Sequence, residues 1–422
     1  MAPHHQGGFD LATCVRPNIL KLQPYRCARD DYEDDGTNIL LDANENPYSR
    51  SASISDEIAF HGLNRYPDPH QHALKQLLCK LRNTHTHTSS DLTPSNLFVG
   101  VGSDEAIDAL QRCFCTPGRD KILTSPPTYG MYSVSACVND VSIVKVPLDT
   151  SDFSLRPDAI NETLSADPTI KIVYICSPGN PTGALIQKDS IAKVLQNQAW
   201  NGIVVLDEAY IDFAKEGSSL AEWVLEWPNL VVMQTLSKAF GLAGIRLGAA
   251  FTSPEIAALL NNFKAPYNIS EPTSQIASTA LSEEGLAMMR ENRKKILAQR
   301  DRLVDRLPKV PGIGRFLGGM DSNFLLVEML DAPREKGGKP SNEVALKVYE
   351  TLAEQYRVVV RFRGKEPGCL GCLRITVGTE DEVTKLLDRI MVTLSAIHEG
   401  RLASKAPAEE KREEALANGV VA

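Results

Sequence analysis

Residues 202–210 read Gly-Ile-Val-Val-Leu-Asp-Glu-Ala-Tyr, a short apolar run that ends in two carboxylates. A run of branched apolar residues of this length predicts a strand that is buried on both faces. An acid at the end of such a strand, here Asp207, is costly unless a cationic group pairs with it. The stretch therefore predicts a buried strand whose carboxyl end carries an acid in need of a partner.

Similar apolar runs occur before and after this one along the chain. Together with 202–206, the predicted strands are 97–101, 121–123, 143–146, 170–175 and 230–233. Helical stretches separate many of them, at 104–115, 188–196 and 255–260. Alternation of this kind predicts an α/β fold, with a mostly parallel sheet and helices on both of its faces.

The pattern changes after about residue 285, which predicts a second, smaller α+β domain. Its expected elements are a long charged helix at 284–307, a helix near 343–354, and strands at 323–327, 358–360 and 373–377. Polar stretches at 83–95 and 333–341 read as surface loops. We expect an N-terminal arm with part of the small domain at 1–65, a large domain at 66–300, a small domain at 301–400, and a tail without stable structure at 401–422.

Composition excludes several classes of protein. Of the 422 residues, 43% are hydrophobic, which excludes wholesale disorder, and the net charge of −8 argues against nucleic-acid binding. No run approaches 18 apolar residues and the first ten residues lack a signal-peptide pattern, so we expect no membrane association. Nine scattered cysteines suggest reduced thiols in the cytoplasm. The single C-x-x-C at 369–372 has no second pair, and we expect no metal site.

Ligands of open α/β sheets bind at the carboxyl ends of the strands, so the residues after each strand are the candidates. Residues 100–105, Gly-Val-Gly-Ser-Asp-Glu, open a helix whose amides suit an anion, although alone they are more typical of an ordinary helix cap. The turn at 177–183 presents the amide of Asn180. Lys238 follows another strand and is a candidate Schiff-base amine, because low dielectric and cationic neighbours lower the pKa of a lysine.

Asn180, Asp207, Tyr210, Lys238 and Arg246, in this order, resemble the fold type I aminotransferases, which use pyridoxal phosphate (PLP). The resemblance covers about residues 25–394. It implies a PLP-binding large domain with a mostly parallel, seven-stranded sheet, and a smaller α+β domain.

The resemblance also implies catalytic roles for Lys238, Asp207 and Tyr210. Lys238 would form the covalent bond to PLP, and Asp207 would keep the ring nitrogen protonated so that the ring acts as an electron sink. Asn180 and Tyr210 would hydrogen-bond the phenolic oxygen of the ring. The ring of Tyr129 would stack on the pyridine face. Other cofactor-binding residues would hold the phosphate, namely Ser103, Asp104, Ser237 and Arg246.

Further stretches look like the histidinol-phosphate aminotransferase family, namely 22–25, 41–47, 64–69, 127–132 and 372–378. That family implies that Tyr66 reaches the PLP phosphate of a neighbouring subunit, and hence a homodimer. The implied substrate-binding residues are Tyr25, Asn44, Arg361 and Arg374. Arg363 competes with Arg361 for the second position of the anion clamp, since alternation on a strand points both the same way.

The resemblance implies reversible transfer of an amino group between L-histidinol phosphate and 2-oxoglutarate, giving imidazole acetol phosphate and L-glutamate, in L-histidine biosynthesis. Two activities of the same fold stay open. One is an aromatic or broad-specificity amino-acid aminotransferase, and the other is a PLP-dependent decarboxylase of a phosphorylated amino acid. A non-catalytic regulator of this fold is disfavoured, because the chain is acidic and only about 20 irregular residues precede residue 25.

Overall fold

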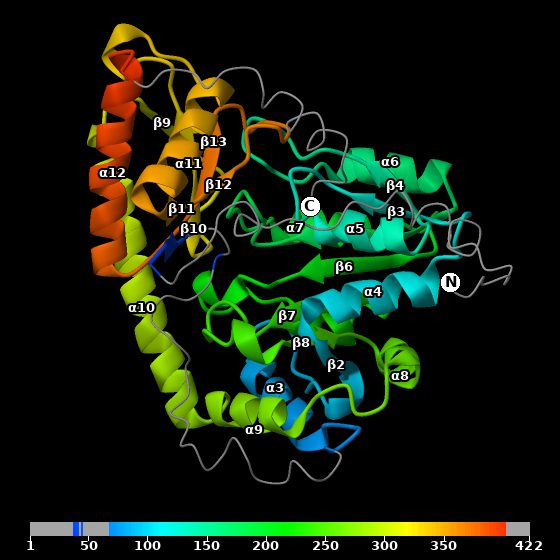
Figure 1. The fold of residues 1–422 in the computed structure, drawn as a ribbon. Coiled ribbons are helices and arrows are strands. Elements are labelled where there is room, and N and C mark those ends of the chain that lie inside the picture. Colours follow the sequence, from blue (N-terminus) through cyan, green and yellow to red (C-terminus); the bar gives the residue numbers. More distant parts are fainter. Residues whose placement is uncertain (1–36, 42–43, 45–66, 402–422) are drawn as a thin grey trace, which may run out of the picture.

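The computed structural model describes residues 37–41, 44 and 67–401 (Figure 1). Two of the predicted site residues, Tyr25 and Tyr66, lie outside the described residues, as do the predicted tail and most of the predicted arm. In the described ranges, no helix is long and apolar enough to cross a membrane.

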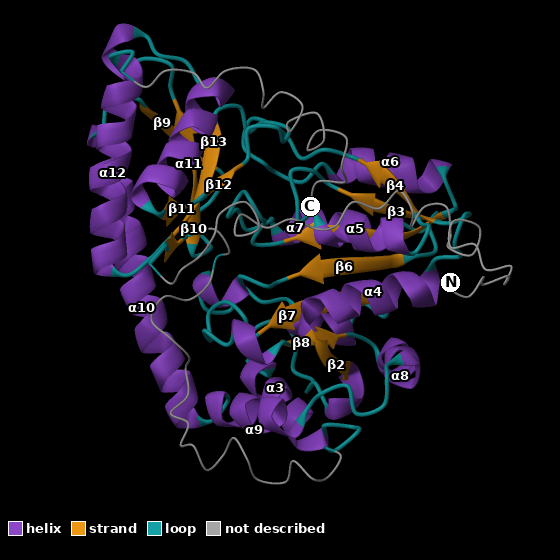
Figure 2. Ribbon diagram, in the orientation of Figure 1, coloured by secondary structure: helices purple, strands orange, loops and turns teal. Residues whose placement is uncertain are grey.

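A seven-stranded sheet with the order β2-β8-β7-β6-β5-β3-β4 forms the centre of the large part of the molecule (Figures 1 and 2). Its strands are β2 (Leu97–Val101), β3 (Lys121–Thr124), β4 (Ser142–Lys145), β5 (Ile170–Cys176), β6 (Ile203–Asp207), β7 (Leu230–Thr235) and β8 (Leu247–Phe251). Only β8 runs antiparallel to its neighbours β2 and β7. The predicted α/β fold with a mostly parallel, seven-stranded sheet is therefore confirmed.

Helices cover both faces of this sheet, which is why its strands are apolar at successive positions. They are α3 (His72–Arg82), α4 (Gly102–Phe114), α5 (Met131–Val138), α6 (Pro157–Ala166), α7 (Lys188–Leu195), α8 (Pro254–Phe263) and α9 (Glu271–Ala280). One face of the sheet packs on α4, α5 and α8 through side chains such as Ile172, Val205 and Met233. Alternate residues such as Val173 and Leu206 belong to the larger core on the other face.

A second, antiparallel sheet with the order β12-β13-β10-β9 lies beside the first one. Its strands are β9 (Ile313–Leu317), β10 (Phe324–Met329), β12 (Arg361–Phe362) and β13 (Cys372–Thr376), and it packs with α11 (Asn342–Tyr356) and α12 (Glu380–His398). Nearby, β1 (Ile39–Leu40) pairs in parallel with β11 (Val358–Val359). The 24-residue helix α10 (Glu283–Arg306) runs from α9 beside the large sheet to α12 beside the small one (Figure 1).

Several elements were not predicted, among them α3, α5, α6 and α9, and three others show the physical reasons. The strands β8, which reads Leu-Gly-Ala-Ala-Phe, and β9 lack the run of β-branched residues that marks the other strands. The third, α12, does carry a start signal in the sequence. Thr379 and Glu382 form a capping box, in which each side chain accepts a hydrogen bond from the backbone amide of the other residue.

Candidate active site

The carboxyl ends of β5, β6 and β7 meet at one edge of the large sheet, where Cys176 lies directly across from Asp207. A cavity of about 170 Å³ opens at this edge. Nine predicted residues line it, namely Ser103, Asp104, Tyr129, Asn180, Asp207, Tyr210, Ser237, Lys238 and Arg246. Cys176, Ala209, Thr235 and Ala243 complete the lining. The parallel ends of β5, β6 and β7, together with the antiparallel pair of β2 and β8, thus bring together residues that are up to 143 positions apart in the sequence (103 to 246).

The Asp207 carboxylate is 2% exposed, and its hydrogen-bond donors within the described chain are both neutral. The Tyr132 hydroxyl donates to Oδ2 at 2.6 Å, and the Ala209 amide donates to Oδ1 at 3.1 Å. Burial raises the pKa of Asp207 to about 6, although the bond from Tyr132 and the positive charge of Lys238 act against that rise. A buried acid with neutral donors, facing a cavity, fits the protonated ring nitrogen of PLP.

Lys238 lies in the turn after β7, where the Gly241 amide donates to its carbonyl oxygen at 3.1 Å. Its Nζ is 5.8 Å from the centre of the Tyr210 ring, which lies at the far end of the Asp207–Tyr210 loop. An amine and a buried carboxylate thus face one cavity from adjacent strand ends. This donor set fits PLP, because the amine can bond to its aldehyde while the acid meets its ring nitrogen.

The start of α4 is open to an anion. Its N-cap is Val101, which offers no side-chain cap, so the ordinary helix cap that the sequence left open is not found. Gly102 has φ +74°, and a Cβ on it would lie 2.6 Å from Nη2 of Arg246. The Gly102 amide donates to the Arg246 carbonyl at 3.0 Å, which fixes the arginine beside the helix start. A guanidinium beside uncapped helix amides fits a phosphate group.

Ser237 and Asp104 flank this cradle. The Ser237 amide donates to Oγ1 of Thr235 at 3.1 Å, which fixes the turn that carries Lys238. The Asp104 carboxylate accepts hydrogen bonds from Nη2 of Arg246 at 3.4 Å and from the Tyr129 hydroxyl at 3.2 Å. The guanidinium and the tyrosine ring are therefore both tethered to the first turn of α4.

Two hydrogen bonds join the large sheet to the small one across the cavity. The Asn180 side-chain oxygen accepts from Nη1 of Arg374 at 2.5 Å. The Tyr210 hydroxyl accepts from Nδ2 of Asn44 at 2.9 Å, and Oδ1 of Asn44 in turn accepts from Thr376 at 2.8 Å. Asn44 is buried and lies in the left-handed region at φ +54°. The side chains predicted at the ring oxygen are thus coupled to those predicted at the substrate.

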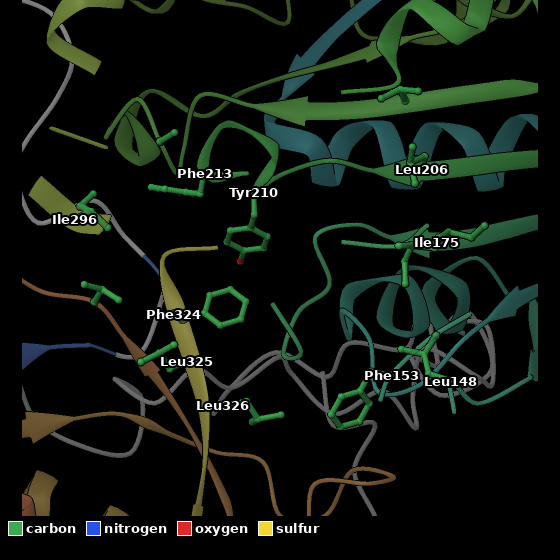
Figure 3. Close-up of a cluster of buried hydrophobic side chains, with 14 of the residues drawn as sticks. Leu148, Phe153, Ile175, Leu206, Tyr210, Phe213, Ile296, Phe324, Leu325 and Leu326 are labelled. Carbon is green, nitrogen blue, oxygen red and sulfur yellow. The ribbon is translucent and has the colours of Figure 1, made fainter. Parts of the chain in front are cut away.

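An apolar contact reinforces this coupling. The ring of Tyr210 points toward that of Phe324, the first residue of β10, with ring centres 5.1 Å apart and nearly perpendicular planes (Figure 3). The centre of the Phe324 ring also lies 5.4 Å from the guanidinium of Arg374. Tyr210, Phe324 and Arg374 therefore form a continuous series of contacts from the end of the large sheet into the small one.

The small sheet presents a cluster of arginines. Arg361 and Arg374 are direct partners in the antiparallel pair of β12 and β13, so their side chains leave the same face of the sheet. Burial and the charges of Arg363 and Arg361 lower the pKa of Arg374 to about 9. Arg363 forms an ion pair of 2.7 Å with Glu366, which offsets its charge. Arg361 therefore shares a sheet face with Arg374, and Arg363 is paired with Glu366.

Sequence reasoning missed Tyr132 as a member of the site. It lies within the quoted stretch 127–132, but the distance of 75 positions to Asp207 hides their contact. The available signal was chemical, because a buried carboxylate requires hydrogen-bond donors. Cys176 was missed for a similar reason, since its position opposite Asp207 depends on the register of β5 and β6.

Residues 36–390 match the family model for class I and II aminotransferases. The chain is 54% identical over 386 residues to the histidinol-phosphate aminotransferase of Schizosaccharomyces pombe, an alignment that covers 92% of this chain and 98% of that protein. The chain belongs to the histidinol-phosphate aminotransferase family. Its member from Candida maltosa is 52% identical over 396 residues, covering 93% of this chain and 100% of that protein.

Solved structures of the histidinol-phosphate aminotransferase family share the fold. The enzyme from Sinorhizobium meliloti, in complex with pyridoxal 5′-phosphate, matches with a TM-score of 0.76 at 21% identity, covering 91% of this chain and 98% of that one. The aspartate aminotransferase from Thermus thermophilus with maleate matches with a TM-score of 0.73 at 18% identity, covering 90% and 99%. The fold thus extends beyond the histidinol-phosphate aminotransferase family.

Proposed function

We propose that this protein is a PLP-dependent histidinol-phosphate aminotransferase. It transfers the amino group between L-histidinol phosphate and 2-oxoglutarate, a step of histidine biosynthesis. The observation that carries the proposal is the shared cavity of Lys238, Asp207 and Arg246, in a chain 54% identical to a relative of that name. When bound, PLP would supply the electron sink that stabilises negative charge at the substrate Cα.

Each residue of the cavity has a defined task in this proposal. Lys238 holds the cofactor in the resting enzyme and, when released, moves a proton at the substrate Cα as general base and then acid. Asp207 holds the proton on the cofactor ring nitrogen, and Arg246 with the first turn of α4 holds the phosphate. Asn180 and Tyr210 orient the ring through its phenolic oxygen, and Tyr129 covers its face.

We propose that Arg374 binds the acidic group of both amino donors, and that Arg361 with Tyr25 favours the phosphate of histidinol phosphate. The pairing of Arg361 and Arg374 on one sheet face supports this assignment. Two guanidiniums offer fork geometry to an anion with more charge than one carboxylate. One clamp then serves both half-reactions, which is what a ping-pong reaction requires.

We further propose a cytoplasmic homodimer in which Tyr66 completes the site of the other subunit. Exposed apolar side chains beside the phosphate cradle support a partner there: Val101 is 43% exposed and Tyr267 is 42% exposed. The carboxylate of Glu105 accepts hydrogen bonds from the Val101 amide and from Nδ2 of Asn268, the residue after Tyr267. The buried thiols of Cys79 and Cys369, whose pKa values burial raises to about 12, suit a reducing compartment.

The half-reaction tests the proposed function. Purified protein loaded with PLP is mixed with L-histidinol phosphate, L-glutamate, or an aromatic amino acid, and the visible absorbance of lysine-bound PLP is followed. We expect the band to disappear with the first two amines, with formation of pyridoxamine phosphate. A response to aromatic amino acids alone would support the broad-specificity alternative, and release of carbon dioxide would support the decarboxylase.

A further inference from the structure

Tyr132, in the first turn of α5, is the donor that meets the buried carboxylate of Asp207. Its hydroxyl lies 2.6 Å from Oδ2, and the side chain is completely buried. A hydrogen bond to an ionised group is about twice as strong as one between neutral groups, so this contact carries weight in the energetics of the site.

Two aromatic contacts hold the ring of Tyr132, and a hydrogen bond holds its backbone. The ring stacks face to face on Tyr174, with ring centres 4.5 Å apart and planes 11° apart. Tyr129, which lines the cavity, meets it edge-on at 5.6 Å. The backbone carbonyl of Tyr132 accepts a hydrogen bond from Nε2 of Gln111 at 3.2 Å. The hydroxyl therefore has a fixed position, and it fixes one oxygen of Asp207 in turn.

The proton of this hydrogen bond belongs to the tyrosine. Burial, followed by the charge of Asp207, raises the pKa of Tyr132 well above its ordinary value. The bond lowers the pKa of Asp207 and so opposes the effect of burial on that carboxyl group. Tyr132 thus favours the ionised carboxylate, which is the form that can pair with a protonated ring nitrogen.

We propose that Tyr132 is a positioning residue that holds the Asp207 carboxylate ionised and correctly oriented for the ring nitrogen of the cofactor. The proposal rests on the proposed function, in which Asp207 pairs with that nitrogen. Tyr132 acts through Asp207, because it is not among the residues that line the cavity. Its effect must therefore depend on whether the ligand has a nitrogen at that position.

The chain offers a matched control in Tyr174. Tyr174 is equally buried and stacked on the same ring, but its hydroxyl donates to the Ile107 carbonyl at 3.3 Å and is 3.5 Å from Gln111. Tyr132→Phe and Tyr174→Phe each remove one hydroxyl group from the same stacked pair of rings. Only the first removes a donor from Asp207.

The experiment measures dissociation constants of PLP and of its 1-deaza analogue, in which carbon replaces the ring nitrogen, by equilibrium dialysis against the full-length apoprotein. We expect Tyr132→Phe to weaken PLP binding about tenfold or more. We expect the same variant to change binding of the analogue by less than about twofold. The preference for PLP over the analogue should therefore fall in Tyr132→Phe and stay at the wild-type value in Tyr174→Phe.

Two outcomes overturn the proposal: a wild-type preference in Tyr132→Phe, or equal losses of preference in both variants. If wild-type protein fails to bind PLP, the proposed function itself is wrong, and that result is distinct from both. If Tyr132→Phe yields no folded protein, Tyr132→His, which keeps a ring and an N–H donor, is measured in the same way. Asp207→Asn, which removes the carboxylate itself, is measured as the reference. The preference of Tyr132→His for PLP over the 1-deaza analogue should exceed that of Asp207→Asn, and equal preferences in these two variants overturn the proposal.

Discussion

The two halves of the candidate site differ in the charge that they gather. On the large-sheet side, a buried carboxylate receives hydrogen bonds from a phenol and an amide, and its pKa rises to about 6. On the small-sheet side, Arg361, Arg363 and Arg374 crowd together, and the pKa of Arg374 falls to about 9. The buried Asp207 thus disfavours further negative charge beside it, and the arginine cluster disfavours further positive charge. Each of these two groups is matched to a ligand group of the opposite sign, while Arg246 at the far end of the large-sheet half suits the cofactor phosphate.

Removal of the amine from the large-sheet half should have the largest effect. Lys238→Ala is expected to lower the rate of amino transfer by at least about 10²–10⁴-fold, because the proposed function assigns to this amine the proton transfer at the substrate Cα. The variant should still bind PLP, without the visible band of the lysine-bound form. Steady-state rates and absorbance spectra measure both effects. Lys188→Ala, which removes an amine over the Trp223 ring, is the control.

Substitutions in the small-sheet half sharpen the comparison, since they should affect substrate binding more than cofactor binding. Arg374→Gln is expected to lower kcat/KM roughly 10- to 100-fold for both amino donors, the effect of losing one charged hydrogen bond. Arg361→Gln should lower it more for histidinol phosphate than for glutamate. Arg363→Gln, whose charge Glu366 offsets, should have the smallest effect. Equal losses on both donors in Arg361→Gln would refute its bias toward phosphate.

The destabilisation of the folded state by the buried, ionised Asp207 can be measured in the apoprotein. The pKa of Asp207 rises from 3.8 to about 6 in the fold, so the native state binds more protons than the unfolded state between these values. Ionisation of Asp207 therefore lowers the free energy of unfolding progressively as the pH rises from about 4 to 6. The whole of this destabilisation is present above pH 6. Asp207→Asn should stabilise the apoprotein at pH 8 by about 1–3 kcal/mol, and the gain should shrink toward pH 4.

Urea unfolding at several pH values measures this effect. Asp212→Asn is the matched control, because Asp212 pairs with the guanidinium of Arg82 at 2.9 Å and its loss should destabilise the protein. A loss of stability at pH 8 in both variants would show that Asp207 is already satisfied without a cofactor. That result would remove the contrast between the buried acid beside the large sheet and the arginine cluster of the small sheet.

The smallest expected effect concerns the phosphate cradle. In Gly102→Ala, a side chain at φ +74° costs about 1–2 kcal/mol, and the new Cβ displaces the Arg246 guanidinium. PLP affinity should fall roughly three- to tenfold. Gly244→Ala, two residues before Arg246 in the chain, is the control, since a Cβ there would meet nothing within 4 Å. Thermal unfolding and equilibrium dialysis measure stability and affinity, and equal effects of both variants would contradict this account of the cradle.

The sequence predicted the strands that carry the site, because β5, β6 and β7 are runs of branched apolar residues and ligands gather at their carboxyl ends. The positions of Asp207, Lys238 and Asn180 follow from that rule alone. The link between the two halves does not follow from it. Asn44 and Tyr210 are 166 positions apart, and Arg374 and Asn180 are 194 apart, so only the folded chain reveals these contacts.

The loop predicted at 83–95 shows the same limit. Its polar composition indicates a surface loop, but Glu222 anchors it from within. This carboxylate is 1% exposed and accepts hydrogen bonds from the amides of Thr84 and His85 at 2.6 Å and of His87 at 3.0 Å. A polar stretch gives no sign of such a remote anchor. Local patterns therefore predict elements well, and they cannot predict which distant side chain holds an element in place.

The long helix α10 has a geometric consequence for the site. Its 24 residues form a rod of about 36 Å that enters beside the large sheet and ends beside the small one. Insertion of one residue into its first half would turn everything beyond by about 100° and advance it by about 1.5 Å, unless a bulge absorbs the change. The number of residues in α10 thus sets the distance between the Asp207 carboxylate and the Arg374 guanidinium, and an insertion in this helix would change that distance.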